Sequence, residues 1–341
     1  MRNPLPKQSL NKREKSLGTK QPSALPKCSN GVTLNLDELL QYKSQSVRWL
    51  PPAKSLWSQL NGQHESAKRG RGMDFAEVRQ YQAGDDIRSI DWRVTARTGK
   101  PHTKLFSEER EQPTVLYIDL SSSMLFGSTL LLKSVQLAHF VSQICWVTVA
   151  QKDRIGAVID TGFELIEIKP SASHHAPLRI LQKIIEINNK AIADSAAADS
   201  SRADSDKLTR QMPHSFDVAL KSLHQLCPKG SDIIFLSDFI RYEESNRSLL
   251  SQIRTHNRLR FVHFYDPLEL GDTPYKGYQQ ITNGIRTQWL NFSSNKEKQQ
   301  LNHAFKQKQH ELKALSLSLA IPYSSLSCAR PLLEQLSGTY S

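Results

Sequence analysis

Short apolar runs alternate with longer segments of helical periodicity from residue 114 onward, and this alternation constrains the fold more than any other feature. The apolar runs of strand length are TVLYIDL (114–120), RIGAVID (154–160), FELIEIK (163–169), DIIFLSD (232–238) and LRFVHFYDP (259–267). The helical segments between them span about 128–150, 177–189, 216–226 and 243–256. Strands that alternate with helices predict an α/β fold in which a mostly parallel sheet lies between helix layers.

Several segments complete this pattern. The sequence Asp-Thr-Gly at 160–162 joins the second and third strands and suits a tight hairpin turn. The C-terminal part predicts a strand at 286–292, a long polar helix at about 294–316 and a short helix near 330–337. Residues 190–212 are rich in Ala, Asp and Ser without apolar periodicity, which predicts a low-complexity surface loop.

The apolar stretch 130–150 is long enough to cross a membrane, yet polar residues interrupt it. These residues are Lys133, Gln136, His139 and Gln143. Their spacing predicts an amphipathic helix instead of a membrane span. The start of the chain, MRNPLPKQSLNKREK, lacks the apolar segment of a signal peptide. Four scattered cysteines without a CxxC pair indicate neither a disulfide framework nor a zinc site, so we expect a cytoplasmic protein.

The formal net charge of +12 is concentrated near the N-terminus. Residues 1–54 carry ten Lys or Arg residues against three acidic ones, among many Pro, Ser, Asn and Gln residues. This composition predicts a basic, mostly disordered arm over residues 1–55, with one short helix near LDELLQY (36–42). Such an arm is either a solubilising leader or a contact for an anionic surface, which would be nucleic acid or lipid.

Polar oxygen ligands follow the first predicted strand in the stretch YIDLSSSM (117–124). Asp119 falls at the carboxyl end of that strand, Ser121 and Ser123 lie in the following loop, and Asp238 ends a later strand in the same way. Ligand sites of such sheets lie beyond the carboxyl ends of the strands. Carboxylates and hydroxyls suit Mg²⁺ or Mn²⁺, although Ser and Asp also commonly form ordinary caps. We expect a metal that bridges this protein to an acidic side chain of a partner.

This motif and its setting resemble the metal-ion-dependent adhesion site of von Willebrand factor A domains. The preceding segment, RGRGMDFAEVRQYQAGDDIRSIDWRVTARTGK (69–100), resembles the signature of the bacterial domain-of-unknown-function 58 family. The likeness runs from about residue 60 to the C-terminus. The matching positions are Gly70, Gly72, Phe75, Arg79, Tyr81, Gly84, Asp85, Arg88, Ile90, Asp91, Trp92, Ala96 and Arg97.

The resemblance implies a von Willebrand A-like α/β domain at 111–341 behind a signature segment at 56–110. It also implies an adhesion-site hydroxyl before the helix at 216–226, where this chain offers Ser215, or His214 if the register slips by one. The implied metal site is Asp119, Ser121, Ser123, Ser215 and Asp238, holding Mg²⁺ or Mn²⁺ alone or only together with a partner. Proteins of this family are usually encoded beside a MoxR-type AAA+ ATPase, which implies an adaptor role toward a client protein.

The signature segment has nearly balanced Arg and Asp residues, which predicts a β-rich flap held by ion pairs and docked on the main sheet. Trp92 and Phe75 would pack beneath it; the alternative is a face for docking a partner. The main prediction is a non-enzymatic interaction protein. One rival is a metal-dependent hydrolase or nuclease using Asp119, Asp238 and Asp85, although such hydrolysis usually needs more converging carboxylates. Another rival is a nucleic-acid binder acting through the basic arm.

Overall fold

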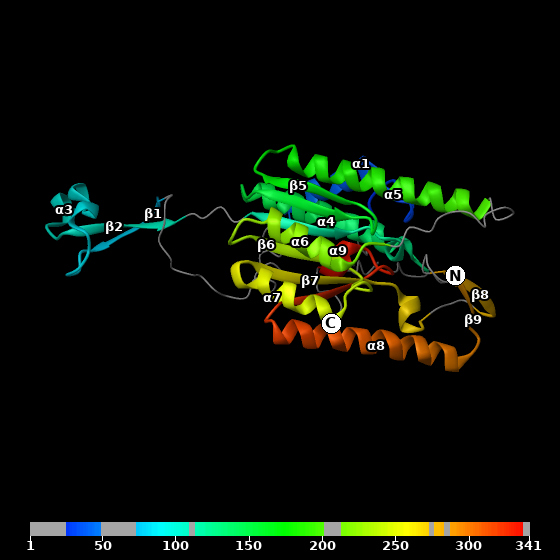
Figure 1. The fold of residues 1–341 in the computed structure, drawn as a ribbon. Coiled ribbons are helices and arrows are strands. Elements are labelled where there is room, and N and C mark those ends of the chain that lie inside the picture. Colours follow the sequence, from blue (N-terminus) through cyan, green and yellow to red (C-terminus); the bar gives the residue numbers. More distant parts are fainter. Residues whose placement is uncertain are drawn as a thin grey trace, which may run out of the picture.

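The protein is described by a computed structural model over residues 25–48, 73–108, 113–200, 213–272, 276–282 and 287–336. Its centre is a six-stranded sheet in the order β10-β7-β6-β3-β4-β5 (Figure 1). The strands are β3 (Thr114–Asp119), β4 (Ile155–Asp160), β5 (Leu165–Ser171), β6 (Asp232–Ser237), β7 (Arg258–Tyr265) and β10 (Tyr323–Ser327). Neighbouring strands are parallel except β4 and β5, which form an antiparallel pair. This doubly wound order confirms the predicted α/β class with a mostly parallel sheet between helices.

Helices cover both faces of the sheet. One face packs against α1 (Leu36–Arg48), α4 (Lys133–Ala150), α5 (Ala176–Ser200) and α9 (Leu332–Leu336). The other face packs against α6 (Phe216–Leu226), α7 (Arg247–His256) and α8 (Asn295–Ser318). Short 3₁₀ helices connect these elements: η1 (Ile87–Ser89), η2 (Ser122–Leu125), η3 (Glu244–Asn246) and η4 (Pro267–Leu270).

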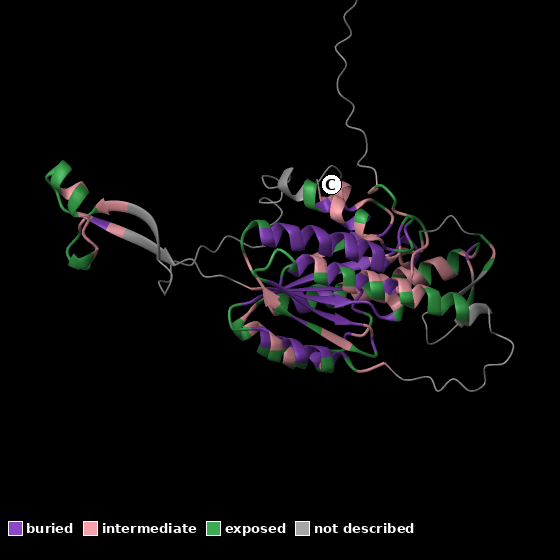
Figure 2. Ribbon diagram, turned by 90° about the horizontal axis from the view of Figure 1, so that it is seen from above, coloured by how far each residue is buried: buried purple, intermediate pink, exposed green. Residues whose placement is uncertain are grey.

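Alternate residues of each central strand enter the two cores. In β3, Leu116 and Ile118 join the core under α4 and α5, whereas Val115 and Tyr117 join the core under α6 and α7. Figure 2 shows the sheet as an almost unbroken buried layer. A strand that is covered on both faces needs apolar side chains at consecutive positions. This explains why the strand signals in the sequence were continuous runs without polar alternation.

Helix α4 departs from the expected amphipathic helix because every residue from Lys133 to Val149 is buried. It packs on the sheet, beside the neighbouring α5 and beneath α1, so it has no solvent-facing side. Two of its polar residues bond to the covering helix α1. His139 Nε2 lies 2.6 Å from Glu38 Oε1 of α1, and the Ser142 hydroxyl donates to the Leu39 carbonyl at 2.7 Å.

The structure bears on two expectations about disorder. Within the predicted arm, the short helix expected near residues 36–42 is present as α1, residues 25–48 are ordered, and α1 buries Leu39 and Tyr42 in the core. Within the predicted loop at 190–212, α5 continues to Ser200, because Ala is the strongest helix former and extends the helix without an apolar face. Residues 1–24, 49–55 and 201–212 lie outside the described ranges.

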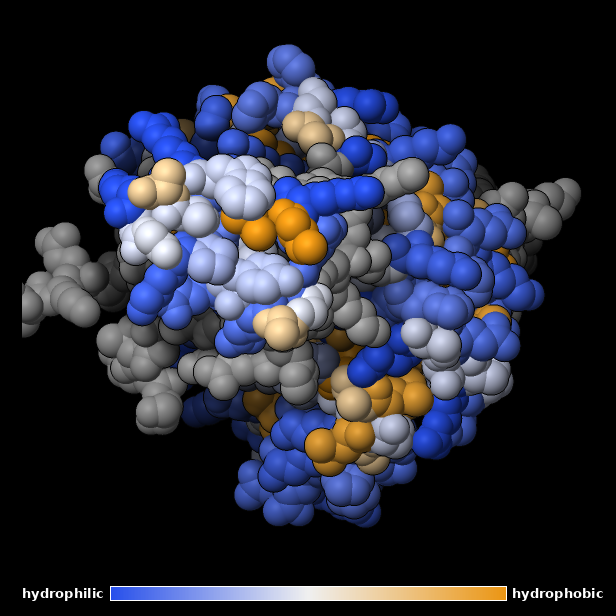
Figure 3. All heavy atoms as spheres, turned by 90° about the vertical axis from the view of Figure 1, so that its left-hand side faces the viewer, coloured by the Kyte–Doolittle hydropathy of each residue, from blue (hydrophilic) through white to orange (hydrophobic). Residues whose placement is uncertain are grey.

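The signature segment forms an antiparallel hairpin of β1 (Met73–Gln80) and β2 (His102–Glu108), with η1 and the short helix α3 (Trp92–Thr98) between the two strands. Figure 1 shows this unit apart from the six-stranded sheet, so the expected docking on the sheet is not observed. Figure 3 views the molecule from the side of this hairpin and shows a largely hydrophilic surface with scattered hydrophobic patches.

Contacts inside this unit follow part of the expectation. Arg79 pairs with Asp85 at 2.8 Å, in line with the expectation that ion pairs hold this segment. Asp91, by contrast, accepts hydrogen bonds from the first backbone N–H groups of α3 and lies 3.5 Å from Lys104. Trp92 is 67% exposed, so the expectation that it packs beneath the flap is wrong. The side chain of Phe75 lies outside the described part.

The C-terminal region holds two elements that the sequence patterns did not predict. The expected strand at 286–292 is β9 (Thr287–Asn291), which pairs with β8 (Tyr278–Thr282) in a separate hairpin. Strand β10 adds a parallel edge strand beside β7. Its sequence, YSSLS, is too polar to resemble the other strands of the sheet.

Candidate functional site

Asp119 lies at the carboxyl end of β3, in the middle of the sheet, and is 1% exposed. Its Oδ1 accepts a hydrogen bond from the Ser121 backbone N–H at 3.0 Å, and its Oδ2 accepts one from the Ser237 hydroxyl at 2.6 Å. Burial raises the pKa of Asp119, and the nearby Arg241 guanidinium offsets part of this effect. The carboxylate is therefore held by the loop that follows β3 and by the last residue of β6.

Arg241 reaches this carboxylate from the turn that follows β6. Its Nη2 lies 3.4 Å from Asp119 Oδ1, 2.6 Å from Asp160 Oδ2 and 2.8 Å from the Tyr117 hydroxyl. Asp160 ends β4 beside Asp119 in register and is fully buried. Tyr117 also donates to Asp160 Oδ2 at 2.7 Å. Sequence reasoning missed Asp160, although it ends its strand in the same way as Asp119 and Asp238.

Lys133 makes a second buried ion pair at the start of α4. Its Nζ lies 2.8 Å from Asp238 Oδ2 and 2.9 Å from Glu269 Oε1 of η4. Burial disfavours the ammonium charge, but the two carboxylates reverse that effect and raise the pKa of Lys133. Burial alone would raise the pKa of Asp238, yet Lys133 holds it below its usual value. In the sequence, Lys133 was only an interruption of an apolar run.

The predicted hydroxyls divide between two places. Ser121 Oγ lies 3.3 Å from Ser123 Oγ, and Ser123 helps to lower the pKa of Asp238. Ser215 is exposed and caps α6 by accepting from the Asp217 backbone N–H at 3.3 Å. Its neighbour His214 reaches the cluster instead, with Nε2 3.1 Å from Asp160 Oδ1. The structure thus brings four predicted residues to one edge and leaves Ser215 in a capping role.

The donor set fits a divalent cation poorly, because protein cations already hold both predicted carboxylates. Asp119 contacts Arg241, and Asp238 contacts Lys133. Within the described ranges, no group of three or more His, Cys, Asp or Glu side chains is arranged to hold a metal ion. A Mg²⁺ ion prefers octahedral oxygen ligands and would have to displace these ammonium and guanidinium groups.

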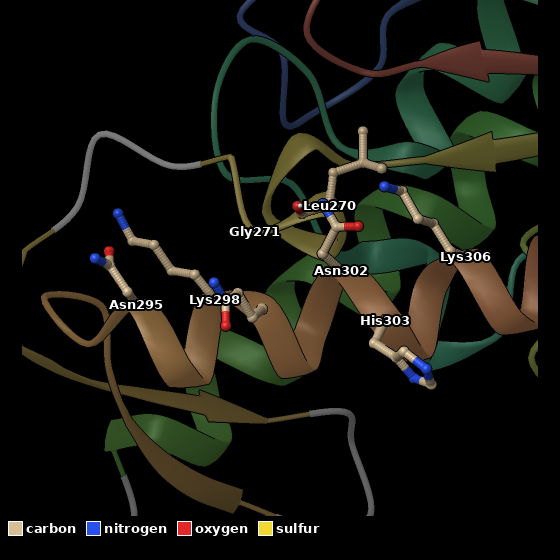
Figure 4. Close-up of a pocket in the computed structure, with 8 residues that line it drawn as sticks. Leu270, Gly271, Asn295, Lys298, Asn302, His303 and Lys306 are labelled. Atoms are coloured by element: carbon tan, nitrogen blue, oxygen red, sulfur yellow. Dashed lines mark hydrogen bonds between the residues drawn. The ribbon is translucent and has the colours of Figure 1, made fainter.

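A separate hollow of about 470 Å³ lies between η4 and α8. Figure 4 shows Asn302 and Lys306 extending from α8 toward the loop that carries Leu270 and Gly271. The Asn302 side chain donates to the Leu270 carbonyl at 2.7 Å. This open polar hollow contains none of the predicted site residues, so the charged cluster is not the wall of a substrate pocket there.

Among the helices described, none is long and apolar enough to cross a membrane.

Comparisons with known proteins place the chain among uncharacterized relatives. Proteins of Mycobacterium bovis and Mycobacterium tuberculosis, each termed uncharacterized, are 35% identical to it over 109 residues, which is 32% of this chain. The match spans only about a third of the length of these relatives, 34% of each. Among solved structures, the conserved hypothetical protein BatB from Bacteroides thetaiotaomicron gives a TM-score of 0.37 at 11% identity. That match covers 66% of this chain and 96% of BatB.

A second solved structure is an aerotolerance-related membrane protein from Bacteroides fragilis. It gives a TM-score of 0.36 at 10% identity, with 63% of this chain and 91% of that chain covered. The model of one protein family matches residues 77–314, which is more than half of the sequence. This range includes most of the signature segment and nearly all of the strands described above. The chain therefore belongs to the family described as protein of unknown function DUF58.

Proposed function

We propose that the chain is a non-enzymatic protein-interaction module that binds partners at the carboxyl edge of its sheet. In this role it serves a MoxR-type AAA+ ATPase as an adaptor in the assembly or maturation of another protein complex. The interaction role is supported by the surface around the charged cluster. The ATPase and the client come from the family resemblance of the signature segment and are the finer part of the proposal.

Exposed apolar side chains border the cluster, and this observation carries the proposal. Phe163 follows β4 and is 53% exposed, and Ile240 follows β6 and is 54% exposed. Since Asp160 and Arg241 are in contact, the two loops that carry Phe163 and Ile240 meet at the cluster. Val218 in the first turn of α6 is 45% exposed. Apolar groups around a floor of internally paired charges are typical of a protein interface.

The same geometry disfavours catalysis by the cluster. A general base or metal-binding carboxylate must be available to a substrate or to water. Asp160 Oδ2 instead contacts both Tyr117 and Arg241, and Asp238 is held by Lys133. The hydrolase alternative would require these buried pairs to open during each turnover. The nucleic-acid alternative concerns the basic arm, most of which lies outside the described residues.

Metal and location remain predictions in this proposal. Binding of Mg²⁺ or Mn²⁺ at this edge stays a hypothesis. The ion pairs of Asp119 and Asp238 argue against it, because both carboxylates already contact a protein cation. The interface proposed here does not need the ion. The cytoplasmic location is supported by the cysteines, since the four described ones are free thiols and three of them are buried.

The test is binding to a MoxR-type ATPase from the same genome, measured by biolayer interferometry with the full chain immobilised. Changing the border residues in the double variant Phe163→Ser with Ile240→Ser should weaken binding at least tenfold, because the contact would lose its apolar centre. The matched control is Leu317→Ser. Leu317 is 82% exposed near the end of α8. The chain passes from there into the start of β10, so Leu317 lies near the amino ends of the strands and not at the carboxyl edge.

Two results would contradict the proposal. Equal binding by the wild type, the double variant and the control would show that the carboxyl edge of the sheet takes no part in the interaction. Turnover of phosphodiesters or nucleotides by the purified protein, lost in Asp119→Asn and in Asp238→Asn, would show an enzyme. Folding of each variant is checked by circular dichroism, so that a loss of binding is not mistaken for unfolding.

A further inference from the structure

We infer that Arg241 takes the place of a divalent cation at the carboxyl edge of the sheet, so that the charged cluster assembles without metal. The inference concerns this chain alone and does not depend on the identity of any partner. It follows from the disagreement between the predicted metal ligands and the contacts that those residues make.

The first argument is the occupation of the Asp160 carboxylate. Asp160 Oδ2 accepts from the Tyr117 hydroxyl at 2.7 Å and from Arg241 Nη2 at 2.6 Å, which is the number of partners that its lone pairs can serve. Asp160 Oδ1 accepts from the Gly162 backbone N–H at 2.7 Å, and His214 Nε2 lies 3.1 Å away. A metal could bind Oδ2 only by displacing Tyr117 or Arg241.

The second argument is the position of the guanidinium group. A single atom, Arg241 Nη2, lies within 3.4 Å of Asp119 and within 2.6 Å of Asp160, and so joins the ends of the adjacent strands β3 and β4. One cation between two strand-ending carboxylates is the arrangement that a bridging metal would create. The Arg241 side chain is only 16% exposed, so its charge acts inside the protein and is little screened by solvent.

The third argument is the backbone that delivers Arg241. Phe239 has a φ of 55°, in the left-handed region that non-glycine residues rarely adopt. The turn is closed by the Tyr242 N–H, which donates to the Phe239 carbonyl at 3.1 Å. At its start, Asp238 Oδ1 accepts from the Ile240 N–H at 3.1 Å. A strained turn that is pinned at both ends holds Arg241 in one direction, which is expected for a built element of a site.

The cluster contains its own cations. Four carboxylates, of Asp119, Asp160, Asp238 and Glu269, face Arg241 and Lys133. The guanidinium and ammonium groups therefore supply positive charge to both halves of the cluster, at the places where a metal would otherwise be needed.

The test measures Mn²⁺ binding to the full chain by electron paramagnetic resonance of the free ion, with thermal unfolding as a second readout. The wild type should leave the free Mn²⁺ signal undiminished, and its thermal midpoint should not respond to millimolar Mg²⁺, Mn²⁺ or EDTA. In Arg241→Ala the midpoint should fall, because Asp119 and Asp160 lose their shared cation. This variant should then bind about one Mn²⁺ per chain, through the two carboxylates so released, and the ion should restore part of the midpoint.

Two further variants make the result specific. Arg241→Lys keeps a cation at the site and should remain insensitive to metal. Arg247→Ala removes an exposed guanidinium that pairs with Glu244 at 2.9 Å on the surface, and should behave as the wild type does. One-to-one Mn²⁺ binding by the wild type, abolished in Asp119→Asn, would overturn the inference. So would a folded Arg241→Ala protein that takes up no divalent ion. If Arg241→Ala does not fold, the wild-type and Asp119→Asn measurements decide alone.

Discussion

Replacing Lys133 with Met should strongly destabilise the protein, because it leaves a carboxylate buried without its cation. Lys133 and Asp238 have side chains that are 1% and 2% exposed, and their charged atoms lie 2.8 Å apart. The same ammonium also holds Glu269 at 2.9 Å. Removal of one partner from a buried pair costs about 3–5 kcal/mol. Domains unfold with free energies of about 5–15 kcal/mol, so this loss is a large fraction of the total.

Urea denaturation at a series of pH values measures the effect and tests its cause. In the wild type, Lys133 holds the pKa of Asp238 below its unfolded value of about 4. The stabilisation from this pair is therefore fully present above that value and is lost as the pH falls through the lower folded pKa. In Lys133→Met, burial is no longer opposed and favours the protonated carboxyl. The difference from the wild type should thus be largest near neutral pH and should shrink toward pH 4.

Two controls separate charge from side-chain volume. Lys183→Met removes a surface lysine that is 33% exposed and pairs with Glu186 on α5, and it should cost no more than about 0.5 kcal/mol. Adding Asp238→Asn to Lys133→Met removes the stranded charge and should recover part of the lost stability. A loss below about 1 kcal/mol in Lys133→Met, or a loss that does not change with pH, would refute the buried-pair argument.

Three shorter predictions test other parts of the fold by the same urea assay. Leu39→Ala in α1 should cost about 2–5 kcal/mol, whereas exposed Ser44→Ala should be nearly neutral; equal small effects would mean that α1 is dispensable. Burial lowers the pKa of His263 to about 4, so stability should fall by about 3 kcal/mol from pH 6.5 to pH 4, and His263→Gln should flatten this slope. Tyr117→Phe removes the hydroxyl between Asp160 and Arg241 and should cost about 1–3 kcal/mol; no measurable change would indicate that water replaces it.

Most strands of the six-stranded sheet could be predicted from the sequence, because burial on both faces requires continuous apolar runs. Strand β6 is buried at all six positions and was evident as DIIFLSD. Strand β10 is an edge strand with only Leu326 buried, so its sequence contains little that distinguishes it from a loop. Edge strands are covered less completely than central ones, and their apolar signal weakens accordingly.

The packing of the N-terminal region could not be predicted, because composition does not record tertiary contacts. Residues 1–54 are basic and polar on average, yet the few apolar residues of α1 pack on α4. The covering of α4 by α1 also explains why a helix with His139 and Gln143 in its middle is buried. Glu38 lies 101 positions before His139 in the sequence, and only the fold shows that the two are partners.

For the candidate site, the sequence predicted where the carboxylates lie but not which groups they contact. The carboxyl ends of parallel strands meet at one edge, so the sequence could place Asp119 and Asp238 together. It could not show what neutralises them, because the answer lies in side-chain directions from a turn and a helix start. Arg241 was not among the predicted site residues, and Lys133 was identified only as a polar interruption of an apolar stretch. Once both cations are found inside the cluster, oxygen ligands at a strand end no longer imply a metal. A search for such sites must therefore count the Arg and Lys residues within reach of each carboxylate before it assigns an ion.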